Sequence, residues 1–209
     1  MEPTIEFYNE HAQEFFDSTY YIDMTEHIDR FTKHLVTGGK ILDLGCGSGR
    51  DICEFKRRGF QVEGLDASEE LVKLALERTG SIIRLGQIEN LDVKNEYDGI
   101  WCCASLLHVD KLDLMDVVDQ IYDALKDHGF LYASFKYGDS ERNSKGRYFV
   151  DFNETSVRKL FLKKGKFGLR ECYISYDLRP GREKERWINI IVEKNVHNTD
   201  WRTRSLNSL

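Results

Sequence analysis

The stretch Ile41-Leu42-Asp43-Leu44-Gly45-Cys46-Gly47-Ser48-Gly49-Arg50 decides the fold of this chain. Apolar residues lead to an acid and then to three alternating glycines, which predicts a buried strand, a tight turn and a helix. A second apolar run, Phe60 to Leu65, ends in Asp66, twenty-three residues after Asp43. Glycine lets the backbone approach a ligand closely, and the helix N-terminus points N–H groups into the same space. A carboxylate after the second strand can accept both ribose hydroxyls, so we expect a nucleoside-containing cofactor at the carboxyl ends of a parallel sheet.

The glycine spacing separates two kinds of nucleoside cofactor. The dinucleotide fingerprint is G-x-G-x-x-G, whereas this chain has G-x-G-x-G with Asp43 two residues before the first glycine. An acid at that place would repel a pyrophosphate but suits a cationic amino group. The charge therefore favours S-adenosylmethionine over NAD, and an NAD-dependent oxidoreductase is the less favoured alternative.

These residues resemble the Rossmann-like (class I) S-adenosylmethionine-dependent methyltransferases, in particular their bacterial small-molecule and tellurite-resistance-like group. The likeness covers about residues 5–193 and rests on motifs at 42–49, 62–68, 97–108 and 125–131. In the last motif, Asp127 and His128 replace the proline and glycine usual in the family. The first two motifs are specific for the cofactor and do not identify the methyl acceptor.

The resemblance also implies where the cofactor would bind. The glycine turn with its acid would hold the methionine end, the acid of the second strand the ribose, and the segment after the third strand the adenine. A small residue after the fourth strand would line the cleft. The predicted cofactor-binding residues are Asp43, Gly45, Cys46, Gly47, Gly49, Asp66, Ala67, Gln87, Ile88 and Cys103. S-adenosylhomocysteine would be the product.

Strand and helix patterns alternate from Lys40 onward. The predicted strands lie near 40–44, 60–65, 81–85, 97–103 and 129–135, and the predicted helices near 49–58, 68–78, 111–126 and 154–163. Two further strands, 167–178 and 185–194, have no helix between them, as in the hairpin that closes methyltransferase sheets. We therefore expect an α/β fold: a doubly wound, mostly parallel seven-stranded sheet with an antiparallel last strand inserted between the fifth and sixth.

A helical cap is expected before this sheet. Apolar residues recur at helical spacing over Ile5–Phe16, and Asp23 precedes a second helical stretch through Val36. The expected organisation is one domain over 1–194, with the cap at 1–38 and a polar tail at 195–209.

Composition limits the remaining function classes. Five cysteines without paired spacing fit a reducing, cytoplasmic location and predict no metal site. No apolar run approaches the roughly 20 residues that cross a bilayer, so we expect no membrane partner. A net charge of −6 disfavours nonspecific polyanion binding. The only prolines, Pro3 and Pro180, leave no [D/N/S]-P-P-[Y/F/W] or Pro-Cys segment, so DNA base methylation is not expected.

The acceptor side is less specific. Transfer from a sulfonium needs positioning more than covalent help, and a general base only where the acceptor must lose a proton. His108, after the fourth strand, is the candidate catalytic base, and a plain hydrogen-bonding role is its alternative. Arginines among aromatics suit a carboxylate, a phosphate or a flat anionic ring, whereas a solvated basic rim is the other interpretation. The predicted substrate-binding residues are Tyr8, Tyr20, Lys136, Tyr137, Arg147, Arg179, Arg182 and Trp187.

The predicted function is therefore methyl transfer from S-adenosylmethionine to O, N or S of a small molecule, an anionic one being favoured, by in-line displacement. Two alternatives stay open. An RNA could be reached through the segment 179–186, and a non-catalytic S-adenosylmethionine-binding module could use the tail around Trp201 to dock a partner.

Overall fold

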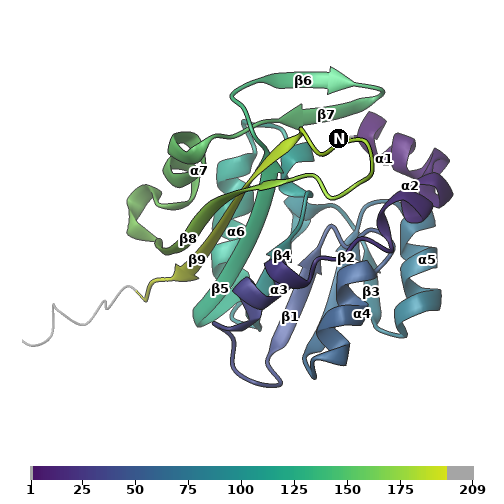
Figure 1. Cartoon of the computed structure of the whole chain (residues 1–209). Coiled ribbons are helices and arrows are strands. Elements are labelled where there is room, and N and C mark those ends of the chain that lie inside the picture. The colour runs from purple at the N-terminus through teal and green to yellow at the C-terminus, as the bar shows by residue number, and fades with distance from the viewer. Residues whose placement is uncertain (1, 197–209) are drawn as a thin grey trace, which may run out of the picture.

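A central sheet with strand order β3-β2-β1-β4-β5-β9-β8 organises the computed structural model, which describes residues 2–196 (Figure 1). Residues 1 and 197–209, and with them most of the predicted tail 195–209, lie outside the described residues. The strands of this sheet are β1 (Lys40–Leu44), β2 (Gln61–Asp66), β3 (Ile82–Leu85), β4 (Tyr97–Cys102), β5 (Leu125–Lys136), β8 (Phe167–Tyr176) and β9 (Arg186–Lys194).

The strand directions follow from the lengths of the connections. β1 pairs in parallel with β2 and β4, β2 with β3, and β4 with β5, and a helix or a long crossover joins each pair. The loop between β8 and β9 is too short for such a crossover, so these strands are antiparallel. β9 also runs antiparallel to β5 and lies between β5 and β8. The predicted seven-stranded, mostly parallel sheet with an antiparallel last strand is confirmed.

Helices follow the parallel strands in the expected order. They are α4 (Arg50–Arg57), α5 (Glu69–Thr79), α6 (Leu114–Ala124) and α7 (Glu154–Phe161). The side chain of Ser68 caps α5 by accepting a hydrogen bond from the Leu71 N–H at 3.2 Å. The helix predicted at 111–126 is shorter at both ends: its backbone turns extended at Leu125, with φ −72° and ψ 140°, and β5 begins there.

The cap consists of three short helices, α1 (Glu2–Glu10), α2 (Ala12–Thr19) and α3 (Thr25–Thr32). The single helix expected over Ile5–Phe16 is interrupted at His11, whose backbone has φ −116° and ψ 22°. The His11 imidazole lies 2.9 Å from the Phe7 carbonyl and stacks on the Phe7 ring. The break divides the expected helix into α1 and α2, which periodicity alone does not reveal.

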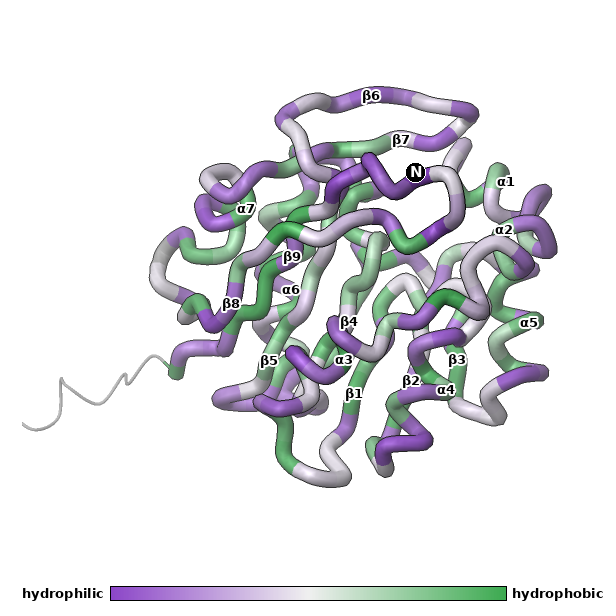
Figure 2. Tube along the Cα trace, viewed as in Figure 1, coloured by the Kyte–Doolittle hydropathy of each residue, from purple (hydrophilic) through white to green (hydrophobic). Residues whose placement is uncertain are grey.

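A two-stranded hairpin, β6 (Glu141–Ser144) with β7 (Arg147–Val150), occupies a segment in which no strand was predicted. Its turn residues Lys145 and Gly146 have φ of 50° and 79°. Two left-handed residues match the twist of a hairpin, but lysine replaces the usual Asn or Asp and hides the signal. Figure 1 shows α1 and this hairpin above the same edge of the sheet, and Figure 2 shows β6 to be largely hydrophilic.

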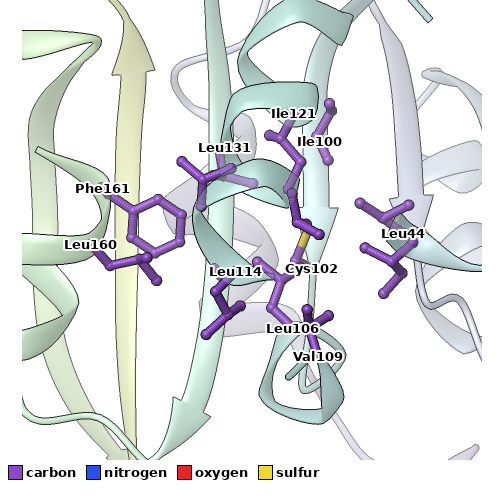
Figure 3. Close-up of a cluster of buried hydrophobic side chains, with 14 of the residues drawn as sticks. Leu44, Ile100, Cys102, Leu106, Val109, Leu114, Ile121, Leu131, Leu160 and Phe161 are labelled. Carbon is purple, nitrogen blue, oxygen red and sulfur yellow. The ribbon is translucent and has the colours of Figure 1, made fainter. Parts of the chain in front are cut away.

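Strand periodicity divides the core between the two faces of the sheet. Ile100 and Cys102 of β4 point into one apolar cluster, and Trp101 between them points into the other. α6 and α7 cover the first face, where Phe161 and Ile121 pack near Leu131 of β5 (Figure 3). α3, α4 and α5 cover the second face.

Within residues 2–196, no helix has the length and apolar character needed to cross a bilayer.

Candidate functional site

The glycine turn between β1 and α4 packs directly against the loop after β4. The Gly45 N–H donates to the Leu65 carbonyl at 2.7 Å, and Gly45 has φ +82°. A Cβ atom on Gly45 would lie 2.3 Å from the Cβ of Ser105, which no real pair of atoms tolerates. The Ser105 hydroxyl donates to the Leu44 carbonyl at 2.6 Å and holds this contact in place. Only glycine fits here, so the turn can pack this closely on the loop after β4.

Asp66, at the end of β2, is tied to the same turn. One carboxylate oxygen accepts a hydrogen bond from the Gly47 N–H at 2.8 Å, and the other accepts one from the Ser68 N–H at 2.9 Å. Burial raises the pKa of Asp66, and the backbone N–H groups oppose that effect. The carboxylate is thus oriented before any ligand binds.

A cavity of about 420 Å³ lies between the glycine turn, the cap and the ends of the strands. Thirteen of the predicted site residues line it: Tyr8, Gly45, Gly47, Asp66, Ala67, Ile88, Cys103, His108, Lys136, Arg147, Arg179, Arg182 and Trp187. They come from α1, from the ends of β2 and β5, from the segments after β1, β2, β3 and β4, from β7, from the β8–β9 connection and from β9. The structure therefore brings residues from both the predicted cofactor set and the predicted substrate set to one cavity.

Four predicted cofactor-binding residues lie outside the lining. Asp43 is 2% exposed, and burial followed by the neighbouring Asp51 raises its pKa. Because the carboxyl is buried behind the turn, the predicted contact between its charge and a cationic amino group has no support in the geometry. Cys46 is buried, and Gly49 begins α4, where a Cβ would lie 2.5 Å from Thr79. Gln87 precedes a short 3₁₀ turn, beside the lining residue Ile88.

Two predicted substrate-binding tyrosines also point elsewhere. The Tyr20 hydroxyl lies 3.7 Å from the Cys53 sulfur, and the Tyr20 ring stacks on Phe16. The Tyr137 hydroxyl donates to Glu154 at 3.0 Å, and the Arg186 guanidinium covers its ring. Neither tyrosine is among the residues that line the cavity, so the geometry gives their predicted role in substrate binding no support.

Arg50 is a site residue that the sequence reasoning missed. It lines the cavity, and its guanidinium forms two hydrogen bonds with Asp51, at 2.6 and 2.8 Å. Asp51 also accepts a hydrogen bond from the indole N–H of Trp101 at 2.9 Å. Burial alone would lower the pKa of Arg50, but Asp51 raises it. A cation in the first turn of a helix interacts unfavourably with the helix dipole. This unfavourable placement is the sequence signal that could have indicated a role for Arg50 in the site.

One wall of the cavity is built around Asp177. Its carboxylate accepts hydrogen bonds from Lys136 Nζ at 3.1 Å, Arg179 Nε at 2.8 Å and Trp187 Nε1 at 3.2 Å. Burial would raise the pKa of Asp177, but Arg179 and Lys136 lower it well below its usual range. Two of the predicted cations, Lys136 and Arg179, are thus paired with a carboxylate of their own chain.

His108 lies between the cap and the hairpin. Its Nδ1 is 2.6 Å from the Tyr148 carbonyl, which can only accept, so Nδ1 carries the proton. Its Nε2 is then free to accept, and it lies 3.0 Å from the Tyr8 hydroxyl. Burial lowers the pKa of His108 to about 4. The imidazole is therefore neutral near pH 7.

Among residues 2–196, no group of three or more His, Cys, Asp or Glu side chains is arranged to hold a metal ion.

Known proteins share both the domain and the fold. Residues 41–129 match a family model described as a methyltransferase domain. YqeM of Bacillus subtilis, named as a methyltransferase, is 29% identical over 123 residues, which are 52% of this chain and 50% of that protein. The ubiquinone biosynthesis O-methyltransferase of Xanthomonas campestris is 32% identical over 104 residues, 46% of this chain and 43% of that protein. The chain thus spans about half the length of these curated relatives.

Solved structures give the same fold over most of the chain. The 1,6-didemethyltoxoflavin-N1-methyltransferase of Burkholderia thailandensis, solved with 1,6-didemethyltoxoflavin and S-adenosylhomocysteine, has a TM-score of 0.74 at 21% identity. The likeness covers 92% of this chain and 85% of that one. A TehB-like methyltransferase from Corynebacterium glutamicum has a TM-score of 0.69 at 17% identity. That likeness covers 91% of this chain and 99% of the other. The tellurite-resistance-like subgroup stays a prediction. Residues 41–129 of this chain thus match a methyltransferase domain, and its sheet has the α/β fold of the class I S-adenosylmethionine-dependent methyltransferases.

Proposed function

We propose that this protein transfers the methyl group of S-adenosylmethionine to an oxygen, nitrogen or sulfur atom of a small molecule. The observation that carries the proposal is the cavity of about 420 Å³. The glycine turn and Asp66 face it from one side, and cations and aromatic rings face it from the other. When bound, the donor supplies an activated sulfonium methyl group, so an aligned acceptor nucleophile needs little covalent help.

The cofactor side is assigned as follows. The backbone at Gly45 and Gly47 leaves room for the methionine end, and each Asp66 oxygen retains acceptor capacity for a ribose hydroxyl beyond its one N–H bond. Ile88 offers an apolar surface to the adenine. Cys103 lines the cleft, and its pKa is raised to about 12 mainly by burial, which favours the neutral thiol and a packing role. The tight space at Gly45 and the oriented carboxylate both fit the donor.

His108 is proposed as a positioning residue. The prediction was a catalytic base with a hydrogen-bonding role as the alternative, and the contacts favour the alternative. With a pKa near 4 the imidazole is a weak base, and its Nε2 already faces the Tyr8 hydroxyl. We infer that His108 orients Tyr8 beside the acceptor.

A small-molecule acceptor is supported by two observations. The names of the related proteins refer to an oxygen acceptor in ubiquinone biosynthesis and to N1 of 1,6-didemethyltoxoflavin. Arg179 and Arg182, proposed for an RNA, face Asp177 and Glu185 of their own chain. These pairs leave little free charge for phosphates, and an RNA-binding assay at low salt should detect no affinity.

Two measurements test the proposal. Calorimetry with S-adenosylhomocysteine should show binding by protein stripped of copurified ligand. Incubation of cell extract with the protein and radiolabelled S-adenosylmethionine should place label in the small-molecule fraction. Label in RNA or in protein would refute the acceptor class, and cofactor binding without label in any fraction would favour the non-catalytic module.

A further inference from the structure

Arg147, the first residue of β7, carries a positive charge that has no carboxylate partner in the described part of the chain. Its guanidinium stacks at 4.3 Å from the centre of the Phe7 ring and 5.2 Å from that of Phe149. Among the described residues, no carboxylate oxygen lies within 4.0 Å of it, and its buried Nε has no hydrogen-bond partner. In contrast, Arg142 on the neighbouring strand pairs with Asp151.

Among the described residues, the single polar contact of the Arg147 guanidinium is with a neutral group. Its Nη1 lies 3.5 Å from the Tyr8 oxygen. The Nδ1–H of His108 donates to the Tyr148 carbonyl, so Nε2 accepts and the Tyr8 hydroxyl must donate to it. The Tyr8 oxygen is thus left to accept from Arg147. Burial raises the pKa of Tyr8 and lowers that of His108 to about 4, so neither supplies a negative charge near pH 7.

A half-buried guanidinium with an unpaired N–H is costly unless a partner completes it. The aromatic rings cover the faces of the guanidinium and leave its edges as the donors. A carboxylate or phosphate accepts from such an edge with two parallel hydrogen bonds. The cavity that Arg147 lines is also lined by Tyr8, Phe149 and Trp187, which suits an anion attached to an aromatic ring.

We propose that Arg147 recognises an anionic group on the acceptor, with a carboxylate on an aromatic ring as the favoured chemistry. This inference rests on the proposed function and narrows its substrate class. The site is shared between α1, which supplies Tyr8 and Phe7, and the β6–β7 hairpin, which supplies Arg147 and Phe149. Arg147 thereby acts as a specificity-determining residue, apart from the cofactor contacts.

The test is calorimetry with benzoate, phenyl phosphate and the neutral benzamide, on protein with and without saturating S-adenosylhomocysteine. Benzoate should bind wild-type protein more tightly than benzamide. Arg147→Gln should weaken benzoate binding at least about 10-fold, and Arg147→Lys should give an intermediate loss because the charge stays but the fork is gone. In all variants the affinity for S-adenosylhomocysteine should change less than about 2-fold.

Arg142→Gln is the matched control because its guanidinium is already occupied by Asp151. Equal behaviour of benzoate and benzamide on wild-type protein, absence of binding by both included, would overturn the proposal. So would an equal loss in Arg142→Gln and Arg147→Gln. Tighter binding of phenyl phosphate with the same dependence on Arg147 would support the site and identify a phosphate. Failure of wild-type protein to bind S-adenosylhomocysteine would instead refute the proposed function. The titrations of benzoate and benzamide without S-adenosylhomocysteine would then still test whether Arg147 recognises an anion.

Discussion

The Nε2 atom of His108 lies 3.0 Å from the hydroxyl of Tyr8, which precedes it by one hundred residues. This contact joins the first helix to the loop after β4. The other ring nitrogen contacts the hairpin through the Tyr148 carbonyl at 2.6 Å. One imidazole thus connects three segments that contribute residues to the lining of the cavity.

The titration of His108 should appear in the stability of the protein. Its pKa is about 4 in the folded chain, below the ordinary 6.5. Because the unfolded chain binds a proton between these values and the folded chain does not, the free energy of unfolding falls as the pH drops through this window. The full loss is roughly 3 kcal/mol. Urea unfolding of wild type and His108→Asn at pH 7.5 and pH 4.5 should show a steeper decline in wild type, and parallel declines would refute the burial argument.

Gly45→Ala should destabilise the protein and abolish cofactor binding. The substitution adds the cost of a left-handed backbone, about 1–2 kcal/mol, to a clash with the Ser105 Cβ at 2.3 Å. Gly59→Ala is the matched control because Gly59 has φ +88° and no atom within 4 Å of its added Cβ. Thermal unfolding and calorimetry should show that Gly59→Ala loses some stability but keeps cofactor binding. Similar losses in the two variants would mean that the contact with Ser105 is not tight.

Asp66→Ala should weaken binding of S-adenosylhomocysteine at least about 10-fold, because a charged acceptor of hydrogen bonds is lost. Some stability should be lost as well, since Asp66 accepts from the N–H groups of Gly47 and Ser68. Glu63→Gln, three residues earlier on the same strand and paired with Lys40, should leave the affinity within about 2-fold. Calorimetry decides this, and an unchanged affinity in Asp66→Ala would remove Asp66 from the cofactor site.

Asp177→Asn should lower the free energy of unfolding by about 3 kcal/mol or more. The Asp177 side chain is only 3% exposed, and the loss of its charge would leave Lys136 and Arg179 without their shared partner. Glu185→Gln removes an exposed partner of the same lysine, and about 1 kcal/mol or less is expected. Denaturant unfolding compares the two variants. The affinity for S-adenosylhomocysteine should stay the same in both, and equal stability losses would contradict the central role of Asp177.

Much of the architecture could be predicted from local patterns. The alternation of strands and helices predicted the parallel part of the sheet, and the resemblance to methyltransferases placed the last strand, β9, between β5 and β8. The hairpin of β6 and β7 could not be predicted, because Lys145 adopts a left-handed backbone that its residue type disfavours. The break in the first helix at His11 could not be predicted either, because the helical spacing of apolar residues continues across it.

The sequence by itself determined the glycine turn, the acid after the second strand and the order of the elements, because these depend on neighbours within one strand, turn or helix. Only the tertiary structure decided which of the cations at the cavity are paired with a carboxylate of the protein and which could pair with a ligand. Asp177 and Glu185 pair with Lys136 and Arg179, whereas among residues 2–196 Arg147 contacts a neutral tyrosine and aromatic rings. Whether a cation is paired depends on groups that folding brings within about 4 Å, where the Coulomb interaction is strong. Those groups are often far away in the chain.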